Sequence, residues 1–422
     1  MEPGVSVEKS DYADLVLPQC GMTKIIKYKL CNGFMSVEII NYGATIVGIY
    51  LPDSNGKKSN VILGYDSITG YLNGKNGYLG ATIGRYGHRI ANATFNLKEQ
   101  TYCLSKNDGN HSYHGGVQGF DKKVWDSRVE GNTVLMTYRS CDLEQGFPGD
   151  LDVSVQFVLT NRNQFMVAYN AVPIDKTTPI NIMNQLYFNL SDDPDSGDAS
   201  RHAVKVDSEF VLNMSHDSIP TGDAEQITDG PLDVRKYVPI DELSSLSSKR
   251  ASISGKSAKS REGVTIATQD GTKDTTFRSD SYTVGTYSSP NTGVYYCIEG
   301  LGLRPHAKIK YEPSGRSVQI FSNQPCLYLS LGQELADSAP KIGKAGCHVG
   351  ILAQTGNFPD AVHQEKFPTP WVSPGETYQH TIVYKFRVSG LDCSDEEDGL
   401  PKKEEESLDR KCFEQNAKAV EG

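Results

Sequence analysis

Short runs rich in Val, Ile, Tyr, Phe and Thr alternate with Gly, Asn, Asp and Pro along most of this 422-residue chain. The pattern is clearest in Leu151–Leu159, where Leu, Val and Phe occupy alternate positions, and residues 160–163 form a polar turn before a second run begins at Gln164. Ser36–Ile40 and Thr381–Phe386 read in the same way. Successive side chains of a strand point to opposite faces, so a period of two predicts antiparallel sheet. Helical periodicity is scarce, and we expect an all-β domain of packed sheets.

Charge and composition exclude several classes of protein. The net charge is −10, and residues 391–422 hold 11 acidic and 5 basic residues, which leaves about −4 for the rest of the chain. Such a body has no basic face suited to nucleic acid. No stretch approaches the roughly 18 apolar residues of a membrane span, and the N-terminus does not read as a signal peptide. The nine cysteines form no Cys-x-x-Cys pair, so we expect a reduced, cytoplasmic protein with no membrane contact.

Two segments differ in composition from the β-rich body. Residues 243–280 are rich in Ser, Lys, Thr and Gly, and residues 389–422 are strongly acidic. Neither holds enough large apolar side chains to offset the entropy lost on ordering. We predict an inserted flexible loop and a disordered tail, either of which offers a contact surface for a protein partner.

The most specific motifs lie between residues 84 and 125. Gly84–Ile90 reads GRYGHRI, and Asn110–Trp125 reads NHSYHGGVQGFDKKVW. Glycines after a histidine let a ligand approach the backbone, because they lack the Cβ atom. His111 and His114 are three residues apart, but no nearby Cys, Asp or Glu completes a metal site, so we expect no metal and no organic cofactor.

These motifs resemble those of the aldose 1-epimerase (galactose mutarotase) family, and further matches follow in the family's order over roughly residues 25–388. The resemblance implies a supersandwich of antiparallel sheets in one domain, 25–388, after an extension formed by residues 1–24. It implies a hexose such as galactose or glucose as ligand. Arg89, His114 and Gln324 match family residues that contact the sugar. The family's asparagine is His88 here, and its sugar-binding aspartate falls at Ser279 or Asp280.

Two glutamines occupy the positions where the family carries its proton-transfer groups. Gln185, in the run MNQLYFNL, stands where the family has a histidine acid, and Gln354, in LAQTGNFPD, stands where it has a glutamate base. A carboxamide forms hydrogen bonds but does not titrate near neutral pH. We therefore expect a monomeric hexose-binding protein in which catalysis is absent or strongly reduced.

Two alternatives stay open at this point. His88 or His111 could carry out the proton transfer at a new position, which would make the chain an active epimerase. In a third hypothesis the chain is a non-enzymatic interaction scaffold that uses its Ser-rich loop or acidic tail. If the family roles carry over, Arg89, His114 and Gln324 lie together beside Gln185 and Gln354.

Overall fold

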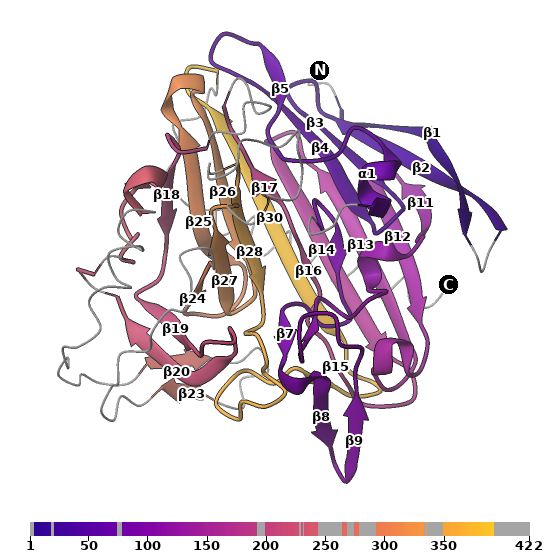
Figure 1. Ribbon diagram of the computed structural model, residues 1–422. Helices are drawn as coiled ribbons and strands as arrows, with labels where there is room; N and C mark the ends of the chain where they lie inside the picture. The colour runs from indigo at the N-terminus through magenta and orange to yellow at the C-terminus, as the bar shows by residue number, and fades with distance from the viewer. Residues whose placement is uncertain are drawn as a thin grey trace.

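The regular secondary structure of the protein, a computed structural model, is almost entirely antiparallel β-strand, which confirms the all-β prediction (Figure 1). The structure describes residues 4–17, 21–73, 78–191, 199–227, 229–230, 232–243, 264–267, 274–277, 293–332, 335 and 349–391.

The largest sheet has nine strands, and strands far apart in the sequence meet in it. Its order is β11 (Asp126–Glu130), β12 (Thr133–Ser140), β13 (Leu151–Leu159), β14 (Gln164–Pro173), β30 (Tyr378–Val388), β26 (Arg316–Ser322), β25 (Arg304–Tyr311), β18 (Ala203–Val206) and β21 (Val238–Pro239). The predicted hairpin is confirmed, since β13 and β14 pair from Leu159 opposite Phe165 onwards. The C-terminal strand β30 lies in the interior of the sheet, between β14 and β26.

A six-stranded sheet and a five-stranded sheet complete the body. The first has the order β17 (Tyr187–Phe188), β28 (Ile351–Gly356), β27 (Cys326–Ser330), β24 (Val294–Cys297), β19 (Phe210–Met214) and β20 (Pro220–Gln226). The second runs β1 (Ser6–Leu17), β2 (Gly21–Cys31), β3 (Ser36–Ile40), β4 (Thr45–Pro52) and β5 (Lys58–Asn60). The predicted N-terminal extension thus forms β1, which pairs with β2 in a hairpin that projects from the body (Figure 1).

Short elements connect the sheets. Two-stranded pairs join β6 (Thr82–Ile83) to β16 (Met183–Asn184), β7 (Arg89–Ile90) to β10 (Ser112–Tyr113), β15 (Thr178–Pro179) to β29 (Trp371–Val372), and β8 (Thr94–Leu97) to β9 (Gln100–Cys103). Helical structure includes α1 (Ile68–Asn73) and single 3-10 turns at η1 (Ala91–Ala93), η2 (Phe120–Lys122), η3 (Glu144–Gly146) and η5 (Glu312–Ser314).

The main hydrophobic core lies between the large sheets and draws on all three. The alternating residues of β13 face inward, and Val155 and Phe157 are fully buried beside Ile39 of β3 and Ile351 of β28. Burying these apolar side chains is the main term that stabilises the arrangement of the sheets. The core therefore fixes β28, the strand that carries Gln354, against the rest of the molecule.

Most of the predicted inserted loop and nearly all of the predicted tail lie outside the described residues. Within 243–280 the structure describes β22 (Val264–Ala267) paired with β23 (Asp274–Phe277), which the composition did not indicate. The flexibility of both segments stays a prediction. Among the described residues, no helix is long and apolar enough to cross a membrane.

Candidate functional site

Arg85 anchors the loop that carries His88 and Arg89. Its buried guanidinium donates through Nη1 to the carbonyls of Pro148 (2.7 Å) and Gly149 (2.9 Å), and through Nη2 to Ser140 Oγ (2.6 Å). Burial lowers the pKa of Arg85 to about 10, which still leaves it charged at neutral pH. The two arginines of the GRYGHRI motif thus have different roles, since Arg85 faces the protein interior and anchors the loop.

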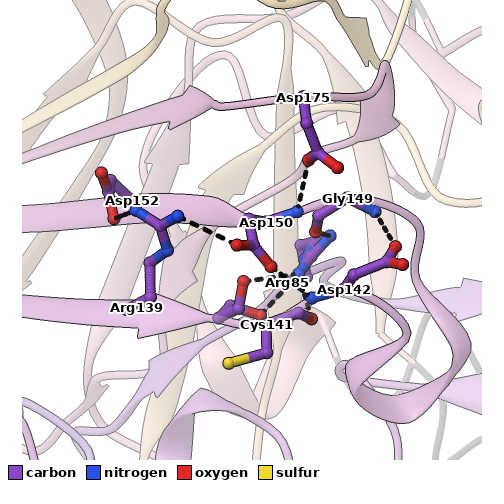
Figure 2. Close-up of polar contacts among 9 residues, drawn as sticks. Arg85, Arg139, Cys141, Asp142, Gly149, Asp150, Asp152 and Asp175 are labelled. Carbon is purple, nitrogen blue, oxygen red and sulfur yellow. Dashed lines mark hydrogen bonds and ion pairs between the residues drawn. The ribbon is translucent and has the colours of Figure 1, made fainter.

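An exposed cluster of ion pairs surrounds the turn at Pro148 and Gly149, whose carbonyls accept hydrogen bonds from Arg85 (Figure 2). Arg139 contacts Asp150 at 2.9 Å and Asp152 at 2.8 Å, and Asp175 accepts a hydrogen bond from the Asp150 backbone. Asp142 accepts the Gly149 N–H at 2.5 Å. These contacts hold in place the backbone carbonyls that Arg85 uses.

His88 and His114 lock two distant loops together. The His88 N–H donates to Nδ1 of His114 at 3.0 Å, and the His114 N–H donates to the carbonyl of His88 at 3.1 Å. The adjoining Gly115 has φ +85°, and a Cβ atom there would lie 1.9 Å from the carbonyl oxygen of Gly84. Only glycine permits this approach, which explains the His-Gly-Gly sequence physically.

The protonation of His114 follows from its surroundings. Its ring stacks on Tyr113 at 3.7 Å between centroids and meets the edge or face of Tyr78 at 4.9 Å. Burial, together with the positive charges of Arg89 and Lys122, holds the His114 pKa well below its usual range, so the ring is neutral at pH 7. Because Nδ1 accepts a hydrogen bond, Nε2 carries the hydrogen and is a donor.

Tyr295 and Tyr328 form an aromatic wall beside His88. Tyr295 of β24 and Tyr328 of β27 are direct cross-strand partners, and their rings lie 4.5 Å apart. The Tyr295 hydroxyl lies 3.3 Å from Nδ1 of His88, and the Tyr328 ring lies 5.4 Å from the His88 ring. Burial lowers the pKa of His88 to about 3, so this ring too is neutral. Sequence reasoning missed both tyrosines, because the register of β24 and β27 brings them here.

Gln185 and Gln354 lie side by side at this cluster. Gln354 is the cross-strand partner of Tyr328, and its Nε2 donates to the carbonyl of Asn184 at 3.2 Å. Gln185 Nε2 donates to the Tyr187 hydroxyl at 3.3 Å, and its side chain lies close enough to His114 to oppose part of the fall in the His114 pKa. The Oε1 atoms of Gln185 and Gln354 are buried, and neither accepts a hydrogen bond from a described residue.

The orientation of the Gln354 amide is fixed by its partner. A backbone carbonyl can only accept, so Nε2 must face Asn184 and Oε1 must face the other way. A buried acceptor without a donor costs about 1–3 kcal/mol, which a ligand hydroxyl would recover. The geometry therefore presents an uncharged acceptor at Gln354, while the Gln185 side chain lies within reach of the neutral His114 ring.

Arg89 reaches the edge of the same cluster. Its guanidinium lies 5.0 Å from the centre of the Tyr113 ring, which stacks on His114, and its Nε donates to Asp108 at 2.5 Å. Its side chain is 24% exposed, so one side of the guanidinium meets solvent. Arg89 is thus a partly neutralised cation at the boundary between His114 and water.

The other predicted site residues have no described hydrogen bond to the site glutamines, or they lie outside the described part of the chain. The Gln324 side chain donates to the carbonyl of Gln379 at 3.0 Å, and no described contact joins it to either site glutamine. His111 accepts the Asn92 N–H at 3.2 Å in the turn before β10. Asp280 and Ser279 lie outside the described residues. A sugar-binding role for Gln324 or Asp280 stays a prediction.

Comparisons with known proteins agree with this arrangement. A profile of the aldose 1-epimerase family matches residues 27–385. Galactose mutarotase from Bos taurus is 32% identical over 390 residues, covering 91% of this chain and all of that protein, and the Homo sapiens galactose mutarotase is 32% identical over 378 residues, covering 88% and 97%. The solved galactose 1-epimerase from Lactobacillus acidophilus superposes with a TM-score of 0.69 at 21% identity, over 91% of this chain and 99% of that one.

The antiparallel supersandwich and the His–Gln cluster thus place the molecule in a known structural class, the galactose mutarotase-like folds. The chain belongs to the aldose 1-epimerase family.

Proposed function

We propose that this protein binds hexoses such as galactose or glucose at the cluster formed by His88, Arg89, His114, Gln185 and Gln354, and that mutarotation is absent or strongly reduced. One observation carries the proposal: Gln185 and Gln354 both carry carboxamides, and the Oε1 atom of each is buried without a donor among the described residues. Mutarotation requires one group that accepts a proton and another that donates one, and an amide does neither near neutral pH.

The hydrogen-bonding inventory supports a polyhydroxylated ligand. Gln185 and Gln354 each offer an acceptor, while neutral His114 offers a donor through Nε2. Sugar hydroxyls both donate and accept, so a hexose can form hydrogen bonds with groups of both kinds. Arg89 adds a charged donor at the exposed side.

The surroundings of His88 do not favour it as a relocated catalyst. With a pKa of about 3, its ring is neutral at pH 7, so it lacks the acidic proton of an imidazolium and is a weak proton acceptor. Its Nδ1 already faces the Tyr295 hydroxyl. The interaction-scaffold hypothesis rests on residues outside the described part of the chain and stays a prediction.

Two measurements test the proposal. Polarimetry of α-D-galactose and α-D-glucose should give rates close to the buffer blank, and a kcat of about 10 s⁻¹ or more would contradict the loss of catalysis.

Calorimetric titration should detect galactose binding with a millimolar or tighter Kd. Gln354→Leu should weaken it about tenfold, because the free acceptor is lost. His216→Gln, at an exposed site, is the matched control. Absence of binding by the unmodified protein would refute the binding half of the proposal.

A further inference from the structure

His380 of β30 is fully buried and holds three segments of the chain with one imidazole. Its Nδ1 lies 2.8 Å from the carbonyl oxygen of Ile182. Its Nε2 lies 2.9 Å from Thr355 Oγ1 and 3.1 Å from Ser322 Oγ. Each of these partners is within three residues of one of the glutamines singled out in the sequence, namely Gln185, Gln354 and Gln324.

The partners fix the tautomer of His380. A carbonyl can only accept a hydrogen bond, so Nδ1 carries the hydrogen and donates to Ile182. Nε2 then has a lone pair for the hydroxyls of Thr355 and Ser322. The Ser322 Oγ in turn accepts the backbone N–H of Gln324 at 3.2 Å, consistent with its own hydrogen pointing at His380.

The hydrogen bonds at Ile182 lie three residues before Gln185 in the same segment. Tyr378, two residues before His380 on the same face of β30, accepts the Ile182 N–H and donates to the Ile182 carbonyl, both at 3.1 Å. The next two residues form β16, which pairs with β6, and the Gln185 N–H donates to the Ala81 carbonyl at 3.2 Å. The contacts of Ile182 with β30 and of residues 183–185 with β6 thus act together to fix the backbone at Gln185.

The hydrogen bond between His380 and Thr355 holds β28 on the face opposite to the Gln354 side chain. Adjacent residues of a strand point to opposite faces, so Thr355 points away from the side where Gln354 meets the Asn184 carbonyl. His380 binds this rear face and does not contact the glutamine side chains in the described structure. Its influence on a ligand is consequently indirect.

We propose that His380 is a positioning residue that sets the separation and alignment of Gln185 and Gln354, and thereby the affinity of the site for its ligand. The affinity part of this inference rests on the proposed hexose-binding function. The structural part does not, because it concerns the backbone at residues 182–185 and 354–355. Displacing polar groups from their bound geometry by about 1 Å can cost up to about a hundredfold in function.

The experiment compares four proteins by hydrogen-exchange mass spectrometry and by galactose titration: the unmodified chain, His380→Phe, His380→Asn and His202→Phe. His202 is the matched control, because it is equally buried and bonds to the backbone of Leu190 and Ala199. His380→Phe should speed exchange at both 182–185 and 354–355 and weaken galactose binding about tenfold or more. His202→Phe should leave exchange at both segments and the Kd within about twofold.

His380→Asn separates positioning from general stability. Its amide can replace Nδ1 as the donor to Ile182 but is too short to reach the Thr355 hydroxyl. We expect faster exchange at 354–355 with protection retained at 182–185. A protein that is merely destabilised would lose protection at both segments alike, and that outcome would overturn the inference.

Thr355→Val keeps the inference testable if His380→Phe does not fold. It removes one hydroxyl at similar volume and should speed exchange at 354–355 relative to the unmodified chain. Unchanged exchange at this segment would refute positioning through Thr355. If the unmodified chain binds no galactose, the proposed function fails, while the exchange pattern still decides the role of His380.

Discussion

Gln354 is adapted to being an amide. Its Nε2 donates to the Asn184 carbonyl, and a glutamate in its place would set a carboxylate oxygen about where that donor lies. Two acceptors would then face each other in a site that is 2% exposed. The carboxylate would be destabilised by roughly 1–3 kcal/mol, and burial would raise its pKa. The amide therefore fits its surroundings better than a glutamate would.

Restoring both proton carriers should nevertheless recover part of the reaction. We predict that Gln185→His combined with Gln354→Glu raises the polarimetric rate at least about tenfold over the parent, because each positioned group is worth about 10²–10⁴-fold. Each single change should recover much less, since one end of the proton transfer stays absent. The four proteins are compared at equal folded concentration with α-D-galactose. If the double variant folds and binds galactose but its mutarotation rate stays at the parent's level, other residues, such as His88, block catalysis.

At the scale of elements, the loop between β6 and β7 depends on Arg85 more than on any ion pair around it. Arg85→Ala should lower the free energy of unfolding by about 3–5 kcal/mol, because it removes a buried cation and leaves buried carbonyls without donors. Arg139→Ala, which removes two exposed ion pairs in the same cluster, should cost about 1 kcal/mol or less. Urea denaturation measures both. Equal losses would mean that Arg85 is not the anchor.

The close approach of the His114 loop to Gly84 can be tested with two matched variants, Gly115→Ala and Gly109→Ala. Gly115→Ala should destabilise strongly, because the new Cβ would overlap the Gly84 carbonyl, and it should also weaken galactose binding by displacing His114. Gly109→Ala also introduces a side chain at positive φ (+59°), but no atom lies within 4 Å of its Cβ. It should cost only the local strain of about 1 kcal/mol. Thermal melts and galactose titrations of both variants separate close packing from backbone conformation.

For the whole molecule, buried neutral histidines make stability depend on pH. The pKa falls to about 3 for His88 and His306 and to about 4 for His380, and burial also lowers that of His114. Each of these contributes stability that is fully present above the unfolded pKa of about 6.5 and is lost as pH falls below it. Each adds about 1.4 kcal/mol per pH unit once the unfolded chain is protonated, so these four give roughly 5.5 kcal/mol per pH unit.

We therefore predict that the free energy of unfolding drops steeply between pH 6.5 and 5, as measured by urea denaturation at several pH values. His363, whose pKa is raised by its hydrogen bond to Asp360, acts in the opposite direction and subtracts from the slope. His88→Asn should remove the contribution of one proton, about 1.4 kcal/mol per pH unit, from the slope of the unfolding free energy against pH. A stability that stays flat down to pH 5 would contradict this account.

The sequence predicted those parts of the molecule that depend on local pattern or on motif order. The β13–β14 hairpin follows from alternation and a polar turn, and the structure places the Gln185 side chain within reach of the His114 ring. Tyr295, Tyr328 and His380 were not predictable, because their roles arise from strand register and from partners over a hundred residues away. The direction of the Gln324 side chain is likewise set by a neighbouring strand.

The position of β30 has a consequence for how the protein is made. This strand, among the last described residues, lies between β14 and β26 and carries His380. Until a ribosome has released residue 388, β14 presents an unpaired edge, and the segments bearing Gln185 and Gln354 lack their common support. Open strand edges attract other chains. Nascent chains are therefore vulnerable to misassembly until β30 has emerged, and the site cannot form completely before then.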